Sequence, residues 1–425
     1  METDINKIYQ SLRKRYLIVY LLASFVDWIQ GPYLYKLYLH YDYTTTDISI
    51  FYITGFLSSA ISGVLIGHLA DKFGRKKLCI FYFISTIIVC LSTTSPDFTV
   101  LHIGRIFGGI STSILFSTFE SWYVSRHMSE DLPQDWMGST FASSTLYNGL
   151  LAITAGILSS ILADTFNYGP VSPFLFAIPV CIITGLLCAT IWRENNKKKV
   201  YSNLLQGLSV IFRNDGLIFY LGLIQTLFET VMYIFVFLWT PILDPIEPSN
   251  GLIFSSFMLC IVFGSGLHSL LANYYQISRL MLLCSSVLLA LFSIAVSTIG
   301  IHLQLQYDYE KIGTYICLIS FLTFELSVGI YYPAVGYLRG IIVPEIHRAS
   351  VANWFRLPSN LLICVVLLYI RIGVPDNRLI FALSAMCLSI ASLYCVEFVK
   401  AYKREYSIIH EDRCSSQTCS KVLYA

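Results

Sequence analysis

The sequence predicts an all-α integral membrane protein in which twelve transmembrane helices form two six-helix bundles. Composition is the first reason, because 56% of the 425 residues are hydrophobic and only 13% are charged, against about 25% charged residues in soluble domains. The second reason is a series of apolar segments of about 20 residues, the length that crosses a bilayer as a helix. The third is a polar stretch that divides these segments six and six. A soluble fold of this size would need a far more polar exterior.

The first half begins with a basic triplet, Arg13-Lys14-Arg15, and with the apolar run from Tyr16 to about Tyr38. This run is too long for the core of a signal peptide and lacks a small-residue cleavage site, so we expect it to stay as the first transmembrane helix. The expected spans of this half are residues 16–38, 47–70, 78–95, 98–123, 137–163 and 171–192.

The second half follows a polar stretch, Arg193 to Asn214, that contains Lys197-Lys198-Lys199. Its expected spans are residues 216–240, 251–273, 279–302, 311–338, 344–370 and 377–400. The predicted organisation is an N-terminal bundle with the start of a cytoplasmic linker, a C-terminal bundle and a polar cytoplasmic tail, at residues 1–199, 200–400 and 401–425.

Lysine and arginine are distributed unevenly between the two sets of loops. Roughly 22 of them lie on the side shared by the N-terminus, the 67–77 loop, the linker and the C-terminal tail, against about 3 on the other side. We therefore expect both termini in the cytoplasm, in a monomeric multi-pass protein of the plasma membrane. The net charge of +2 is too small to suggest nucleic-acid binding. The twelve cysteines show no metal-ligand spacing, so no metal or cofactor is expected.

Five charged residues fall inside the expected spans, where a charge costs roughly 2.5 to 3.5 kcal/mol on insertion scales. They are Asp27, Arg105, Glu229, Glu325 and Arg356. Charges at this depth are functional candidates, and transporters built from two parallel repeats bind substrate near the midplane between their halves. The structural alternative is that these charges form buried ion pairs that only fix helix packing, although such pairs contribute little net stability.

Helical spacing places polar or small side chains beside four of these charges, because residues i+3, i+4, i+7 and i+11 share a face. The predicted neighbours are Gln30, Gly31 and Tyr38 for Asp27; Gly109, Thr112 and Phe116 for Arg105; Gln225, Tyr233 and Thr240 for Glu229; and Ala352, Asn353 and Asn360 for Arg356. Lys36 points about 180° from Asp27 on a straight helix. We interpret it as reaching the outer surface, unless Pro32 kinks the helix.

The loop from Gly67 to Lys77 reads G-H-L-A-D-K-F-G-R-K-K. It resembles the signature loop between the second and third helices of the major facilitator superfamily, which implies a secondary transporter. In that superfamily the loop aspartate also contacts the start of helix 11. We predict that Asp71, Arg75 and Glu120 form a latch at the cytoplasmic gate, and that Gly67 and Gly74 permit the tight turn.

Other segments resemble the molybdate-anion transporter branch of this superfamily more closely. Among them are D-W-I-Q-G-P-Y from Asp27 to Tyr33, W-T-P-I-L-D-P from Trp239 to Pro245, and N-W-F-R-L-P from Asn353 to Pro358. The matching segments are spread from about residue 27 to residue 370. The resemblance implies uptake of molybdate, a tetrahedral oxyanion.

An oxyanion that leaves water needs cations and hydrogen-bond donors, and the guanidinium group supplies both. We predict that Arg105 and Arg356, one from each half, bind the anion. The other predicted substrate-binding residues are Gln30, Tyr38, Thr112, Asn353 and Tyr332. The predicted role of Asp27, Glu229 and Glu325 is to balance the charge of the empty site or to carry protons with the anion.

Two alternatives remain open at this point. The same fold could move another small solute, such as sulfate, a sugar or an amino acid, or the protein could be a transporter-like receptor without net flux. An enzyme is not expected, because no loop groups a nucleophile, a base and an orienting residue. The fifth span lacks the G-P-x-x-G-G string of antiporters, which favours symport or uniport.

Overall fold

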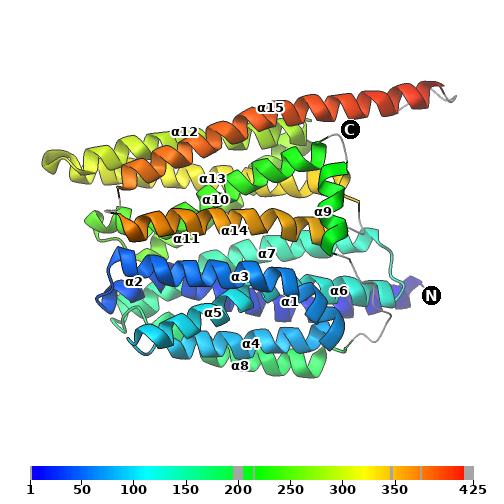
Figure 1. Ribbon diagram of the computed structural model, residues 1–425. Helices are drawn as coiled ribbons and strands as arrows, with labels where there is room; N and C mark the ends of the chain where they lie inside the picture. The colour runs from blue at the N-terminus through cyan, green and yellow to red at the C-terminus, as the bar shows by residue number, and fades with distance from the viewer. Residues whose placement is uncertain (1, 195–203, 214–215, 345–347, 374–375, 416–425) are drawn as a thin grey trace.

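The computed structural model describes residues 2–194, 204–213, 216–344, 348–373 and 376–415, and all regular structure within them is helical (Figure 1). The first half contains α1 (Glu2–Gln30), η1 (Gly31–Tyr33), α2 (Leu34–His40), α3 (Thr45–Phe73), α4 (Arg75–Ser92), α5 (Phe98–Leu115), α6 (Thr118–Ser129), α7 (Asp135–Ser160), η2 (Ile161–Thr165) and α8 (Ser172–Ile191). The second half contains α9 (Leu204–Arg213), α10 (Leu217–Leu243), η3 (Asp244–Ile246), α11 (Asn250–Asn273), α12 (Arg279–Gln304), η4 (Tyr307–Tyr309), α13 (Glu310–Ile342), α14 (Arg348–Ile372) and α15 (Asn377–Ser415).

Eleven helical segments of the described chain are long and apolar enough to span a bilayer. The helix α4 begins with Arg75, Lys76 and Lys77, which lower its hydropathy, but it packs along α5 and α8 as a further member of the bundle. With α4 the described chain has twelve spanning helices, and the predicted fold class is confirmed. Figure 1 shows α1–α8 in the lower part and α10–α15 in the upper part, with the main contacts between them from α7 to α11 and from α3 to α14.

Three spanning segments are interrupted. The first changes from α1 to η1 at Gly31, next to Pro32, which has no backbone N–H and whose ring clashes with the preceding turn of an α-helix. Phe116 and Ser117 separate α5 from α6. The helix α7 ends in the π-helical turn η2, which carries Asp164. Two of these breaks, η1 and η2, lie beside residues that join the halves.

Two helices differ from the sequence expectations. Residues 193–214 are predicted as a polar linker, but α9 forms within them, and its Val210 and Ile211 pack against Ile218 and Val343 of the second half. The helix α15 continues to Ser415, so the predicted polar tail is helical up to that residue. The predicted boundary at residue 199 lies outside the described residues. Both marked ends of the chain and α9 lie at the same end of the bundle (Figure 1).

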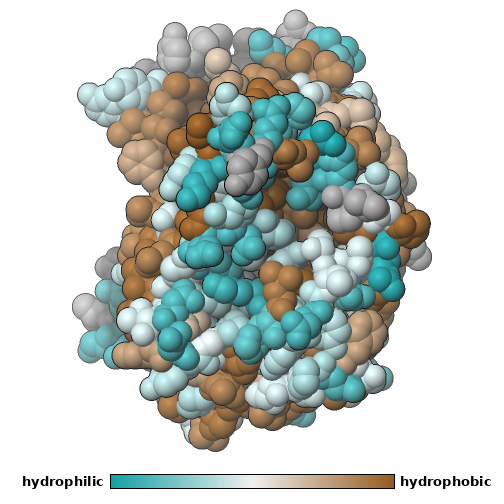
Figure 2. Space-filling view, turned by 90° about the vertical axis from the view of Figure 1, so that its left-hand side faces the viewer, coloured by the Kyte–Doolittle hydropathy of each residue, from teal (hydrophilic) through white to brown (hydrophobic). Residues whose placement is uncertain are grey.

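The opposite end of the bundle carries the short loops between the spans. Figure 2 views this end face, which is hydrophilic over its middle and hydrophobic along its borders. This distribution suits a surface that faces water while the flanks of the bundle face lipid.

Small residues allow α11 and α13 to approach closely. A Cβ atom at Gly329 would lie 2.3 Å from the Ile261 carbonyl oxygen, and one at Gly264 would lie 2.3 Å from the Leu326 carbonyl oxygen. Close contacts of this kind drive helix association in membranes, where no hydrophobic force acts between helices.

We predict that Gly329→Ala lowers the stability of the protein by about 1 to 3 kcal/mol, because its Cβ would overlap the backbone of α11. Gly336→Ala is the matched control on the same helix, since nothing lies within 4 Å of a Cβ there. Thermal unfolding of the purified protein in detergent measures the difference. Equal melting temperatures for the two variants would contradict the packing described for α11 and α13.

Candidate functional site

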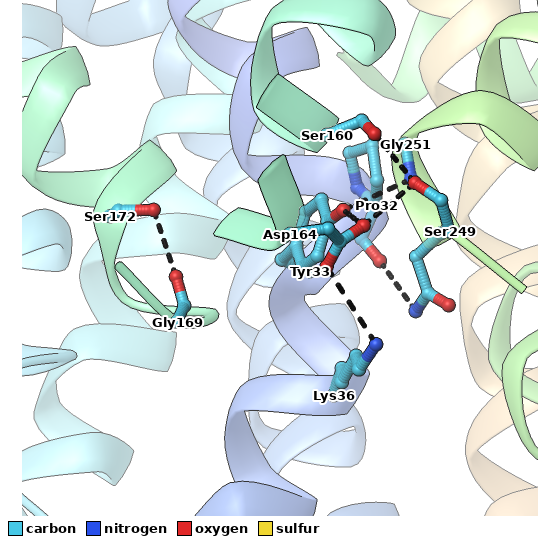
Figure 3. A network of polar contacts seen from close by, with 10 residues as sticks. Pro32, Tyr33, Lys36, Ser160, Asp164, Gly169, Ser172, Ser249 and Gly251 are labelled. Atoms are coloured by element: carbon cyan, nitrogen blue, oxygen red, sulfur yellow. Dashed lines mark hydrogen bonds and ion pairs between the residues drawn. The ribbon is translucent and has the colours of Figure 1, made fainter. Parts of the chain in front are cut away.

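A polar network joins the halves at the end opposite to the termini, with Asp164 at its centre (Figure 3). The Asp164 carboxylate accepts hydrogen bonds from the Tyr33 hydroxyl and, at 2.7 Å, from Ser249 Oγ. Lys36 Nζ lies 3.9 Å from the same carboxylate. Ser160 Oγ lies 2.6 Å from Ser249 Oγ. Because Ser249 precedes α11 and the other residues belong to the first half, these contacts hold the two halves together.

Two further polar contacts cross between the halves at this end. Asn250 Nδ2 donates a hydrogen bond to the Pro32 carbonyl at 3.2 Å. Arg371 of α14 forms an ion pair with Asp47 of α3, with 3.3 Å between Nη1 and Oδ1. Lys36 lies at the end of the bundle where the sequence places it, but its ammonium group faces Asp164.

Aromatic side chains from both halves form a layer next to this network. The ring of Phe237 in α10 lies 5.5 Å from that of Tyr35 and 5.0 Å from that of Tyr52, measured between centroids. The rings of Phe56 and Tyr233 lie 5.1 Å apart. Large rings in contact exclude water. We call these five residues the aromatic layer, and it closes this end of the bundle.

Further toward the termini, side chains face an opening between the halves. Phe116 of the first half is 52% exposed, although its ring centre lies only 5.3 Å from Arg356 Cζ of the second half. Tyr332 is 44% exposed, although it interacts electrostatically with Arg356. Glu120 is exposed and interacts electrostatically with Arg339 of the other half. Because Phe116 and Glu120 are exposed although each meets a residue of the other half, we infer an opening between the halves beside them, and Tyr332 lies next to it through Arg356.

The structure brings Asp27, Tyr38 and Arg105 together in the first half. Arg105 Nε donates a hydrogen bond to the Phe51 carbonyl at 3.3 Å, and its guanidinium carbon lies 5.3 Å from the centre of the Tyr52 ring. Asp27 and Tyr38 both interact electrostatically with Arg105. Since Arg105 and Asp27 are only half-buried, this group remains within reach of a solute.

Gly55 of α3 makes room for Arg105. A Cβ atom at this position would lie 2.6 Å from a guanidinium nitrogen, so a larger residue would move the side chain of Arg105. Gln30 and Thr112, also predicted as substrate-binding residues, each donate a hydrogen bond to a backbone carbonyl of their own helix, at 2.7 Å and 3.0 Å. Both are half-buried.

The second half contains a corresponding group around Arg356. Glu229 accepts a hydrogen bond from Gln225 Nε2 at 2.8 Å. Glu229 and Tyr233 both interact electrostatically with Arg356. Gln225, Glu229 and Tyr233, which the sequence places on one face of α10, therefore lie close to one another. Each half has an arginine near a carboxylate.

Glu325 lies apart from both arginines. It is 5% exposed, and it has no hydrogen bond or ion pair with any residue in the described part of the chain. It interacts electrostatically with Tyr332, whose hydroxyl donates a hydrogen bond to Met232 Sδ at 3.1 Å. The side chain of Asn353 lies outside the described part of the structure.

Asp71 and Arg75, at the junction of α3 and α4, make their described contacts within the first half. Arg75 Nη2 lies 3.4 Å from Asp71 Oδ1, and Arg75 Nη1 donates a hydrogen bond to the Ser121 carbonyl at 3.0 Å. Gly74 ends α3 with a φ of 101°, which glycine adopts without strain. Gly67 lies inside α3, so the prediction that it permits the turn is wrong.

Aromatic contacts connect the two arginine groups. The Tyr52 ring, beside Arg105, lies 6.4 Å from Phe56, and Phe56 lies 5.1 Å from Tyr233, beside Arg356. Two guanidinium groups from different halves thus lie along the same aromatic layer. Their donors suit the oxygens of a small anion, and the carboxylates nearby balance their charge when no anion is bound.

The sequence does not reveal the residues that close the end of the bundle opposite to the termini. Asp164 ends an apolar segment and Ser249 lies in a loop, and nothing in the spacing relates residues 85 positions apart. One signal was available for Asp164, because a lone carboxylate at the end of an apolar segment needs a partner when the chain is folded.

Comparisons with known proteins identify the family. A family model described as sugar transporters with 12 transmembrane segments matches residues 2–314. The molybdate-anion transporter of Takifugu rubripes is 37% identical over 391 residues, which cover 86% of this chain and 80% of the relative. The molybdate-anion transporter of Xenopus tropicalis is 36% identical over 397 residues, which cover 92% of this chain and 86% of the relative. The chain belongs to the molybdate-anion transporter family of the major facilitator superfamily.

The fold agrees with this family assignment. A D-xylose–proton symporter of known structure superposes with a TM-score of 0.70 over 92% of this chain and 97% of its own length, at 12% identity. At this identity the likeness concerns the fold alone.

We predict that Ser160→Cys combined with Ser249→Cys forms a disulfide under mild oxidation, because the two hydroxyl oxygens lie 2.6 Å apart. Mass spectrometry of the digested protein detects the crosslinked peptides. Each single variant, oxidised in the same way, is the control for crosslinks with native cysteines. Absence of the crosslink in the double variant would mean that this end of the bundle is not closed.

Proposed function

We propose that this protein imports molybdate by alternating access. Relatives named molybdate-anion transporters, at 36% and 37% identity, support the substrate. The single observation that carries the proposal is the position of Arg105 beside Tyr52 and of Arg356 beside Tyr233, one arginine in each half, along the aromatic layer that closes one end. Proteins of this fold bind substrate between their halves and expose it to each side in turn.

On this proposal the structure is an inward-facing state. The excess of lysine and arginine on the side of the termini supports a cytoplasmic location for both ends. The proposed location is the plasma membrane, with the protein as a monomer. Molybdate would enter from outside when the contacts of Asp164 and the aromatic layer separate. It would leave toward the cytoplasm through the opening bordered by Phe116, Glu120 and Tyr332. This role is transport without catalysis.

The carboxylates have a separate role in this proposal. Asp27 and Glu229 would compensate the charge of Arg105 and Arg356 while no anion is bound. Glu325, which is buried without a partner in the described chain, would carry a proton that enters with the anion. An ionised carboxylate in a buried site is costly, which favours proton uptake there.

The latch remains a proposal for the closed cytoplasmic gate. Asp71 and Arg75 are already paired at 3.4 Å, while Glu120 faces Arg339 of the second half. We propose that these groups are drawn together when the halves close at the cytoplasmic end. The electrostatic interaction between Glu120 and Arg339 crosses the halves and supports this order of events.

A different solute is the main alternative, since the matching family model is described as sugar transporters. Two arginines beside the aromatic layer favour an anion over a neutral sugar. Competition of labelled molybdate uptake by unlabelled sulfate, tungstate and xylose distinguishes these solutes. Molybdate uptake no greater than in cells without the protein, with the protein present at the surface, would exclude the proposed substrate.

We predict that Arg105→Ala and Arg356→Ala each reduce molybdate uptake by about tenfold or more, since a hydrogen bond to a charged group contributes about 1.5 to 3 kcal/mol. Tracer uptake, corrected for the amount of protein at the surface, is the measurement. Arg378→Ala is the matched control, because Arg378 is partly exposed and pairs with Asp376 outside the proposed site. Wild-type uptake by both site variants would refute the assignment of the anion site.

We predict that Glu325→Gln removes the dependence of molybdate uptake on external pH. If Glu325 carries the proton, wild-type uptake increases as the external pH falls, and the neutral amide cannot take part. Initial uptake rates between about pH 5 and pH 8 measure the effect. Glu397→Gln is the control, since Glu397 is exposed and pairs with Lys400. A variant with the wild-type pH profile would assign the proton to another group.

A further inference from the structure

A pocket lies at the terminal end of the first half, apart from the residues that border the opening between the halves. It has a volume of about 300 Å³ and lies between the ends of α1, α6 and α8. Basic side chains dominate its lining, which contains Lys7, Arg15, Arg126 and Arg193 but a single acidic residue, Glu130. Apolar side chains such as Ile8 and Ile191 complete it. The transport proposal assigns no role to this pocket.

Trp122 lines the pocket, and Trp192 supports it from behind. The indole rings of Trp122 and Trp192 are stacked, with centroids 3.7 Å apart and 6° between their planes, and both are buried. Trp192 Nε1 donates a hydrogen bond to the Arg15 carbonyl, and Trp122 Nε1 donates one to the Arg193 carbonyl, each at 3.0 Å. The backbones that carry Arg15 and Arg193 are therefore fixed relative to each other.

The charges of the pocket are not balanced by its own residues. Glu130, the acidic residue of the lining, already forms an ion pair with Arg126. Arg15 and Arg193 are exposed, and neither forms an ion pair with another residue of the described chain. The pocket therefore presents positive charge from two arginines whose positions the tryptophan pair holds.

The pocket lies at the level of the lipid headgroups along the membrane normal. Arg15 directly precedes the apolar part of α1, and Lys7 lies eight residues earlier, or about 12 Å along a helix. The polar layer on each side of a bilayer is about 5 to 8 Å thick. The pocket thus spans the headgroup layer, with Arg15 at the border of the apolar core and with Lys7 and Ile8 on the side of the water.

We propose that this pocket binds the phosphate-bearing headgroup of an anionic phospholipid. The guanidinium groups of Arg15 and Arg193 would donate hydrogen bonds to the phosphate oxygens, and Ile191, the last residue of the apolar helix α8, would contact the start of the acyl chains. This apolar residue favours a lipid over free phosphate. The assignment to the inner leaflet rests on the cytoplasmic orientation proposed above. All three helices belong to the first half, so the site persists when the halves rotate as rigid bodies.

The test measures binding of phosphatidylserine to the full-length protein in detergent by native mass spectrometry, with phosphatidylcholine as the zwitterionic comparison. We expect Arg15→Gln combined with Arg193→Gln to weaken phosphatidylserine binding by about fivefold for each cation removed. Lys14→Gln is the matched control, because Lys14 is exposed on the same helix and does not line the pocket. A charge-retaining pair, Arg15→Lys with Arg193→Lys, is expected to keep most of the affinity.

Thermal unfolding of each variant without added lipid confirms that it is folded, and the assay is independent of molybdate uptake. If Lys14→Gln weakens binding as much as the double variant, the attraction comes from diffuse surface charge and the proposal is refuted. If inorganic phosphate at millimolar concentration stabilises the protein while phosphatidylserine binds no better than phosphatidylcholine, the pocket takes a soluble anion, and the lipid assignment is wrong.

Discussion

The hydrogen bonds of the Asp164 carboxylate hold the two halves together at one end of the bundle. The carboxylate accepts hydrogen bonds from Tyr33 of the first half and from Ser249 of the second, and Lys36 lies beside it. Hydrogen bonds to an ionised group are stronger than those between neutral groups. While these contacts persist, a solute can approach the arginines only from the end that carries the termini.

The sequence allowed the fold and the intramembrane charges to be predicted for physical reasons. A bilayer requires about 20 apolar residues in each span, so composition and length were enough to place the helices. The helical period then related Asp27 to Tyr38 on one face, and both interact with Arg105 in the structure. Charges in a membrane need partners, which is why Asp27 and Glu229 were recognisable as candidates.

The remaining features depend on tertiary structure. The prediction for Lys36 assumed a straight helix, whereas η1 interrupts the helix at Pro32 and the side chain lies beside Asp164. Ser249 meets Asp164 only because α11 packs against α7, and no local pattern contains this relationship. Likewise α9 forms within a stretch predicted as a polar linker, because Val210 and Ile211 find apolar partners on the second half.

Tyr52 takes part both in the arginine group of the first half and in the aromatic layer between the halves. Its ring supports the guanidinium of Arg105 at 5.3 Å and contacts Phe237 of the second half at 5.0 Å. On the proposed mechanism the end opposite to the termini opens, and the contact with Phe237 is then lost while Arg105 stays attached to α3 through the Phe51 carbonyl. The binding free energy of an anion at the proposed site on Arg105 is therefore linked to the free energy of opening, and this linkage is reciprocal. A change at Phe237, which touches no anion, would alter affinity as well as access.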